Sequence, residues 1–98
     1  MRIDFKFRHC DVSQDLQEYA AEKVHQLEKY ELKPVRLEFT FTKERSELRV
    51  DIHIRGDHLE LHAHSEGDNF LALVDEALHK LARQLSKKKA KVQNHKVS

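Results

Sequence analysis

The basic residues near the end of the chain are the strongest candidates for chemistry in this sequence. No acidic residue follows Glu76, whereas seven lysines and arginines do, so residues 77–98 carry a formal charge of +7. Five polar side chains there have the spacing i, i+3, i+4, i+7 and i+11: Lys80, Arg83, Gln84, Lys87 and Lys91. On a helix this spacing places them in a sector of about 100° beside the apolar stripe.

Closely spaced cations gain most by contacting a row of phosphates, so this stripe predicts a nucleic-acid interface. The simpler alternative is a solvated helix end, where cations also suit the helix dipole. Glu76 is placed to pair with Lys80, which would weaken one member of the stripe.

Lys23 is a second candidate because it interrupts the apolar stripe of the first predicted helix. That stripe includes Leu16, Ala20, Leu27 and Tyr30. The aliphatic part of a lysine can lie in a groove between helices while its ammonium reaches the rim, although an ordinary surface lysine fits too. Lys29 lies about one and a half turns further, on another face.

Eight histidines make a metal site a third possibility. His58, His62 and His64 are predicted on one face of a strand, with His53 and Asp51 on the neighbouring strand. Imidazole and carboxylate groups in such positions can chelate zinc. Because this face is open and nothing forces a tetrahedral set of ligands, a wet face of paired charges is favoured, and no metal or other cofactor is expected.

Catalysis has little support in the sequence. Gly56 and Gly67 are isolated and form no phosphate-binding loop. His9 and Cys10 are adjacent, so a strand would point them to opposite faces. No serine has an evident base and orienting partner. We therefore expect that the protein is not an enzyme.

The elements that must position these residues follow from the hydrophobic period. Apolar and polar residues alternate in four segments, which are predicted as strands with one buried face: 2–8, 35–42, 48–55 and 58–64. Residues 43–46 form a polar turn, and Gly56-Asp57 suits a two-residue turn. That turn would place Ile54 opposite Leu59 and Asp51 opposite His62, with every apolar pair buried.

Two amphipathic helices complete the prediction. The first carries apolar residues from Leu16 to Tyr30, with Asp11 or Ser13 as its cap. The second carries them from Phe70 to Leu85, with Asp68 or Asn69 as its cap, and is expected to fray near residue 93.

The resulting order is β-α-β-β-β-α, an α+β fold. Four strands form one sheet, with the first two parallel, and both helices cover one face in a two-layer sandwich. Residues 1–92 are expected to form a single domain, followed by a basic flexible tail over 93–98.

Composition excludes several classes of protein. With 39% hydrophobic and 36% charged residues and no long apolar run, a membrane protein is excluded and a signal peptide is not expected. The single Cys10 cannot form an internal disulfide and suits a reducing cytoplasm. The net charge of +1 conceals a charge of −6 over residues 1–76.

The sequence resembles the ribosome hibernation promoting factors, the short bacterial relatives of ribosome-associated inhibitor A (the sigma-54 modulation protein family). The resemblance lies in segments 22–30 and 63–70 and, most specifically, in segment 80–89, where Lys-Leu-Ala-Arg-Gln-Leu precedes a lysine cluster. The order of elements also matches, so the resemblance covers essentially the whole chain.

This resemblance implies a fold similar to double-stranded RNA-binding domains and binding to the small ribosomal subunit, in the mRNA and tRNA channel between its head and body. Translation would be inhibited in stationary phase or under stress, leaving inactive ribosomes or ribosome dimers. The residues that carry over as contacts to ribosomal RNA are Lys23, Lys29, Lys80, Arg83, Lys87, Lys88 and Lys91. The implied protein is a cytoplasmic, ribosome-associated monomer when free, with a ribosome modulation factor as a further partner.

The sequence departs from the family pattern at two positions. Phe70 stands where the family often has tyrosine, and Gln26 stands where a basic residue is expected. The absence of an acidic tail or a second domain favours the short type. Two alternatives stay open: a general double-stranded RNA-binding module, and a metal-binding stress protein that uses His53, His62 and His64.

Overall fold

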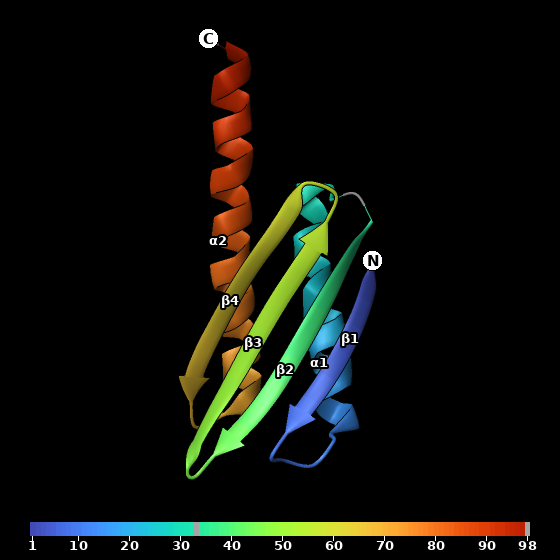
Figure 1. Ribbon diagram of the computed structural model, residues 1–98, viewed down its shortest axis with the longest axis vertical. Coiled ribbons are helices and arrows are strands. Elements are labelled where there is room, and N and C mark those ends of the chain that lie inside the picture. Colours follow the sequence, from blue (N-terminus) through green and yellow to red (C-terminus); the bar gives the residue numbers. More distant parts are fainter. Residues whose placement is uncertain (33, 98) are drawn as a thin grey trace.

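The computed structural model describes the backbone of residues 1–32 and 34–97 and the side chains of residues 1–32 and 34–88. Its elements, in chain order, are β1 (Arg2–Arg8), α1 (Gln14–Val24), the 3₁₀ helix η1 (His25–Tyr30), β2 (Val35–Glu44), β3 (Glu47–Gly56), β4 (Leu59–Gly67) and α2 (Phe70–Val97). The strands lie in the order β1-β2-β3-β4, with β1 parallel to β2 and the other neighbours antiparallel. Both helices lie against one face of the sheet (Figure 1), which confirms the predicted α+β sandwich.

The core lies between the sheet and the two helices. The inward faces of β2 and β3 bury Phe39, Phe41 and Ile52 completely. Phe41 is central, because its ring stacks on Phe7 at 4.9 Å between centroids and meets Phe70 edge to face at 5.4 Å. These rings join β1, β2 and the start of α2, and aromatic pairs in such arrangements add to the stability gained by burial.

The helix starts are those that the sequence allows. Ser13 caps α1, since its hydroxyl accepts a hydrogen bond from the backbone N–H of Leu16 at 3.2 Å. Asn69 does the same for α2, with its side-chain oxygen 3.2 Å from the backbone nitrogen of Ala72. Both bonds satisfy N–H groups that have no partner inside the helix.

The first predicted helix is divided in two. α1 ends at Val24, and η1 continues as a 3₁₀ helix to Tyr30 before Glu31 turns the chain with a left-handed φ of 50°. In a 3₁₀ helix, side chains three residues apart eclipse each other. The Nδ1 of His25 and Oε1 of Glu28 use this spacing and lie 2.6 Å apart.

The pairing of β3 with β4 differs by two residues from the sequence prediction. Ile54 faces Leu61 instead of Leu59, and Asp51 faces His64 instead of His62. The turn is formed by residues 57 and 58, with His58 at a left-handed φ of 58°. A shift of two residues keeps every side chain on its predicted face, so the hydrophobic pattern cannot detect it.

The observed register of β3 and β4 pairs opposite charges across the strands, and β4 extends to Gly67, beyond the predicted end at residue 64. It places Arg49 opposite Glu66 and Arg55 opposite Glu60, so opposite charges face each other across the strands. The β2–β3 turn is also tighter than predicted, because pairing continues to Glu44 and Glu47.

α2 projects beyond the end of the sheet (Figure 1). It continues to Val97, past the expected fraying, and no glycine or proline occurs after Gly67 to end it. The single domain over 1–92 and the basic flexible tail over 93–98 stay predictions, and the side chains of that tail lie outside the described residues. Among the described residues, no helix is both long and apolar enough to span a membrane.

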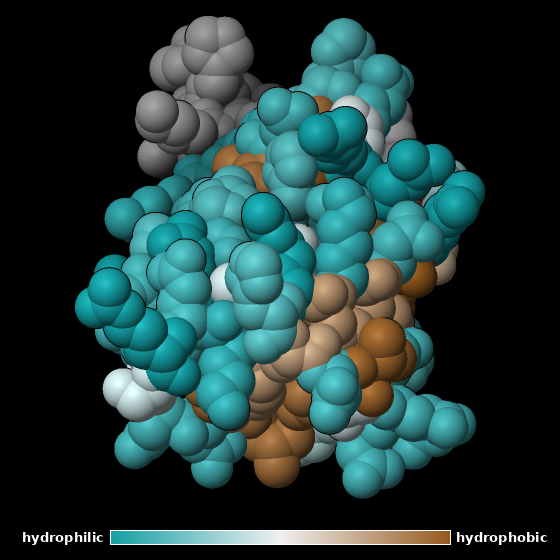
Figure 2. Space-filling view, turned by 60° about the horizontal axis from the view of Figure 1, so that its bottom comes forward, coloured by the Kyte–Doolittle hydropathy of each residue, from teal (hydrophilic) through white to brown (hydrophobic). Residues whose placement is uncertain are grey.

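Hydrophilic side chains cover most of the surface seen from one end of the molecule, with apolar residues gathered in a smaller area (Figure 2). Among the described residues, the exposed large hydrophobic side chains are Met1, Val12 and Leu71. Polar and charged side chains therefore dominate the rest of the described surface. The positions of the charged groups decide which ligands this surface can bind.

Candidate nucleic-acid interface

The buried stripe of α2 fixes which side of the helix faces solvent. Its apolar residues pack against the sheet and are buried: Leu73, Val74, Ala77, Leu78, Leu81 and Leu85. This packing confirms the core predicted for the second helix. Since the rotation of α2 is set by these contacts, the basic side chains emerge at the rim of the helical layer.

One row of side chains on α2 follows the outer edge of β4, and we call Lys80, Gln84 and Lys88 the edge row. Lys80 Nζ donates to the carbonyl oxygen of His64 at 2.9 Å, and Gln84 Nε2 donates to that of His62 at 2.9 Å. Lys88 Nζ donates to the carbonyl oxygen of His58 at 3.0 Å.

The edge row thereby covers the open edge of the sheet. β4 is an edge strand, and its outward carbonyl groups would otherwise be available to another chain. Each ammonium has three N–H donors, so a lysine that bonds one carbonyl retains donors for a phosphate. Glu76 lies 3.8 Å from the Lys80 ammonium, as the spacing predicted.

A second row lies beside the first, and we call His79, Arg83 and Lys87 the outer row. These residues are spaced by four, so they follow one line along the helix surface. All three are exposed. Among the residues whose side chains are described, Arg83 and Lys87 make no ion pair or side-chain hydrogen bond. The described members of the predicted stripe are therefore divided between two rows. Lys80 and Gln84 belong to the row anchored to β4, and Arg83 and Lys87 belong to the row open to solvent.

Lys23 lines a groove between the helices, one of the two positions that the sequence left open. It is exposed on α1 and lines a groove with Gln26 of η1 and with Asp75, Glu76 and His79 of α2. Its ammonium lies 5.3 Å from the centre of the Tyr19 ring, where a cation–π contact is favourable. Because His79 also belongs to the outer row, the groove borders that row.

Tyr19 fixes the two walls of this groove relative to each other. Its hydroxyl donates to the carboxylate of Asp75, at 2.8 Å and 3.0 Å from the two oxygens. This hydrogen bond, followed by burial and the charge of Asp75, raises the pKa of Tyr19 above its usual value. The phenol is therefore neutral and donates at physiological pH, which joins α1 to α2 beside Lys23.

The remaining predicted RNA contacts are less closely placed. Lys29 is exposed on η1, with its ammonium 5.4 Å from the centre of the Tyr30 ring. The backbone of residue 91 belongs to α2, but the side chain of Lys91 lies outside those described. His79 is an addition that sequence reasoning missed, although its spacing of four from Arg83 was a usable signal.

The other face of the sheet has a different electrostatic character. Arg49 binds Asp51 with two hydrogen bonds of 2.9 Å and 3.0 Å and also reaches Glu66 at 3.2 Å. Lys6 lies 3.6 Å from Glu38, and further pairs occur along the face. Burial alone would raise the pKa of Asp51, but the hydrogen bonds and charge of Arg49, with nearby His62, lower it overall. Basic side chains on this face are thus paired with carboxylates, in agreement with the wet face of paired charges that the sequence favoured.

Cys10 and the histidines were the remaining chemical candidates. Cys10 is a half-buried free thiol whose Sγ lies 3.5 Å from the carbonyl oxygen of Phe41, a packing role. Among the described residues, the group with metal-ligating geometry is Asp51, His62 and His64. His53, which the sequence grouped with the two other histidines, is not a member of this group, although the observed register places it opposite His62.

Comparisons with known proteins agree with this architecture. A family model described as Sigma 54 modulation protein / S30EA ribosomal protein matches residues 3–93. A protein of Escherichia coli (strain K12) named ribosome hibernation promoting factor is 29% identical over 97 residues, covering 97% of this chain and 100% of that protein. One of the same name from Pseudomonas putida (strain KT2440) is 28% identical and covers 96% and 92%.

Solved structures show the same fold. A ribosomal subunit interface protein from Coxiella burnetii superposes with a TM-score of 0.79 at 27% identity, covering 92% of this chain and 99% of that chain. The N-terminal domain of Protein Y from Thermus thermophilus has a TM-score of 0.81 at 17% identity, with coverages of 89% and 98%, which is a likeness of fold alone.

Proposed function

Because the chain belongs to the Sigma 54 modulation protein / S30EA ribosomal protein family, we propose that it is a ribosome hibernation factor that binds RNA of the small subunit through α2. The observation that carries this proposal is the outer row, where Arg83 and Lys87 are exposed beside the anchored lysines of the edge row. These groups form a rigid cationic surface on one side of the fold. The names of the relatives support the ribosome as the partner.

The proposed contacts are to the RNA backbone. Lysine and arginine on a fixed helix meet phosphates at defined spacings, and RNA in duplex form is recognised mainly by shape and backbone. Lys23 extends the surface from α2 onto α1, with Lys29 further along η1. Lys91 is included on its sequence position alone. The arginine offers a planar fork for phosphate, while each lysine offers a point charge.

The proposed mechanism is occlusion and involves no catalysis. The folded domain occupies the channel of the small subunit that mRNA and tRNA need, so the ribosome is held inactive during stress or stationary phase. The free protein is a cytoplasmic monomer in this proposal. The paired charges of the opposite sheet face add little net attraction for RNA, which orients the helical layer toward the ribosome.

Co-sedimentation with purified small subunits tests the proposal, with Arg83→Gln/Lys87→Gln as the test variant. Both side chains are exposed, so circular dichroism should be unchanged while binding weakens at least about tenfold, since each lost phosphate contact weakens binding. The matched control is Lys6→Gln/Arg55→Gln, which removes the same charge from the sheet face, where both side chains are more than half exposed. Equal weakening by both variants, or none by the first, would contradict the proposed interface.

The salt dependence of the same assay adds a quantitative check. If about five phosphates are contacted, affinity should fall with a log–log slope of about −4. Generic duplex RNA should compete poorly, and equal affinity for it would favour a general double-stranded RNA-binding module. Sedimentation of whole ribosomes, with and without a ribosome modulation factor, then separates inactive single ribosomes from dimers.

A further inference from the structure

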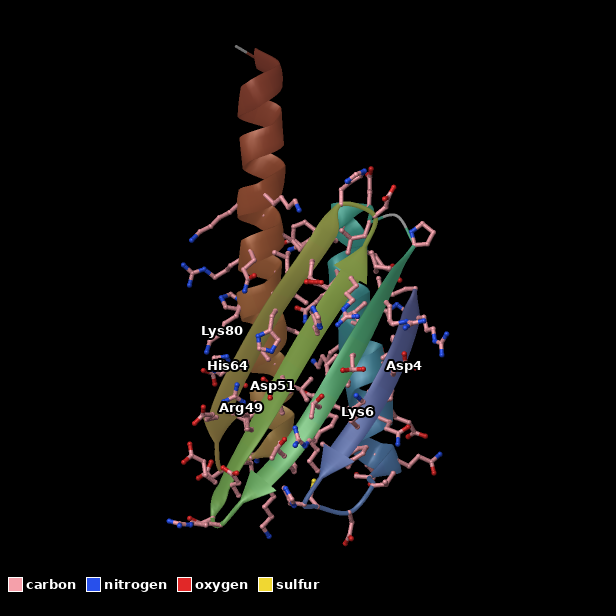
Figure 3. All side chains as sticks on the ribbon, viewed as in Figure 1. Asp4, Lys6, Arg49, Asp51, His64 and Lys80 are labelled. Carbon is pink, nitrogen blue, oxygen red and sulfur yellow. The ribbon has the colours of Figure 1, made fainter. Side chains whose placement is uncertain are left out.

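Three side chains converge on the sheet face opposite the helices, and the proposed function does not use them. One ligand atom each from Asp51, His62 and His64 lies within 4.8 Å of the other two. His62 Nε2 is already 3.1 Å from Asp51 Oδ1. Figure 3 shows the β3–β4 region in which Asp51 and His64 lie beside Arg49.

The sheet itself creates this cluster. Asp51 and His64 are direct cross-strand partners on β3 and β4, and His62 precedes His64 by two residues on β4. Alternate residues of a strand point to the same face, so the two imidazoles and the carboxylate must share one side of a rigid hairpin. The ring centres of His62 and His64 are 6.0 Å apart, and the ring planes are inclined by 28°.

The groups around the cluster hold its ligands in place. Arg49 donates to both carboxylate oxygens of Asp51, at 2.9 Å and 3.0 Å, and so fixes the carboxylate plane. The edge row holds the backbone of β4 at His64 and His62 through their carbonyl oxygens. Such outer contacts orient metal ligands in proteins, although the positive charge of Arg49 also limits affinity for a cation.

We propose that Asp51, His62 and His64 form a binding site for a divalent transition-metal ion of the zinc class. Two imidazoles and one carboxylate suit zinc and its neighbours rather than magnesium or calcium, which prefer oxygen ligands alone. Such an ion binds deprotonated carboxylate and neutral imidazole groups, so any proton on the ligand atoms is released to solvent when it binds. A shallow hollow lined by Arg49, Asp51, His53 and His62 gives the ion access from solvent.

The site is open on one side. Three protein ligands leave a fourth coordination position for water, as in zinc sites that are not closed by four side chains. The exposed histidines need no rearrangement of the core to reach an ion. The ligand side chains lie on the sheet face opposite the helices, although the edge row bonds the backbone of the same strand. The site is tested without ribosomes, so its test does not depend on the proposed function.

Titration of the untagged protein with Zn²⁺ alone, near neutral pH, tests the inference. The wild type should bind one equivalent with well-defined affinity, and thermal unfolding should shift upward as Zn²⁺ is added. His62→Gln and His64→Gln should each weaken that affinity at least about tenfold, since even outer contacts of metal sites contribute about 10–100-fold. Nuclear magnetic resonance of the imidazole nitrogens should show shifts confined to His62 and His64.

His53→Gln is the matched control. His53 is half-buried on the same face, and its ring centre is 6.1 Å from that of His62, yet it lies outside the cluster. Its replacement should leave the Zn²⁺ affinity unchanged. The inference is overturned if the wild type takes up no stoichiometric Zn²⁺, if His53→Gln weakens binding as much as His64→Gln, or if the His62 and His64 variants retain full affinity. Circular dichroism of each variant separates these outcomes from misfolding.

Discussion

At the scale of single residues, basic side chains that are neighbours on α2 have different partners. Lys80 and Arg83 lie one turn apart on α2, but Lys80 bonds the carbonyl oxygen of His64 while Arg83 is exposed on the outer row. The difference comes from β4, whose edge lies beside one row and not the other. The charge of a residue therefore suggests a ligand, while its neighbours decide how much of that charge is available.

Tyr19 provides a residue-scale prediction on pH. Tyr19→Phe removes the hydrogen bond to Asp75 and should lower the stability of the protein near neutral pH. The hydrogen bond, then burial and the charge of Asp75, raise the pKa of Tyr19. A raised pKa means that this stabilisation is complete below about pH 10, the usual value for tyrosine, and is lost as pH rises through the folded-state pKa.

Urea unfolding of the wild type and Tyr19→Phe at about pH 7 and about pH 11 measures this effect. The stability difference should shrink at the higher pH. Tyr30→Phe is the control, because Tyr30 makes no side-chain hydrogen bond within the described part of the chain. A difference that is the same at both pH values would show that the phenol proton has no part in joining the helices.

At the scale of elements, packing between strands and helices decides details that local sequence leaves open. Gly56 ends β3, and a Cβ built there would lie 2.7 Å from Cγ1 of the buried Val35 on β2. Gly67 ends β4, and a Cβ there would lie 3.2 Å from Cδ2 of Leu73 on α2. Each glycine therefore allows a neighbouring side chain to lie close to its backbone. The Val35 side chain beside Gly56 is stiffer than the Leu73 side chain beside Gly67.

Gly56→Ala should destabilise the protein by about 1–3 kcal/mol, since a β-branched valine in the core cannot move aside without strain. For a domain of this size, that corresponds to a fall in Tm of roughly 4–8 °C per kcal/mol. Gly67→Ala is the matched comparison and should cost less, because the end of the Leu73 side chain can rotate. Thermal unfolding of both variants measures the difference, and equal losses would refute the close-approach argument at Gly56.

At the scale of the whole molecule, one core holds together the two layers that carry the functional groups. Phe41 contacts rings from β1, β2 and α2, so the orientation of the basic helix depends on the same aromatic cluster that joins the parallel strands. The same packing places the described basic side chains that follow Glu76 at the rim of the helical layer.

Phe41→Ala should reduce the free energy of unfolding by about 3–5 kcal/mol, the usual cost of removing a buried phenylalanine. Chemical denaturation followed by circular dichroism measures it. Phe5→Ala is the comparison: Phe5 is half-buried, and among the described aromatic pairs it stacks on Phe39 at 5.5 Å, so its loss should be smaller. A smaller loss for Phe41 than for Phe5 would contradict the central role of Phe41.

The sequence by itself determined which elements form, which face of each is buried and to which family the chain belongs. Period-two and helical stripes specify faces directly, and the predicted apolar stripes of α1 and α2 line the core. The basic stripe was predictable for the same reason, since it follows from angles around a helix, whereas the sequence left Lys23 open between a groove and an ordinary surface position.

Only the tertiary structure decided which of these residues meet. A strand register shifted by two leaves every face unchanged, so the pairing of Asp51 with His64 had to come from the turn and from cross-strand charges. The division of the basic stripe into two rows required the edge of β4, and the burial of Ser65, whose hydroxyl donates to the carbonyl oxygen of Leu73 at 2.7 Å, required α2. Periodicity fixes direction within an element, whereas contacts between elements depend on distances that no local pattern contains.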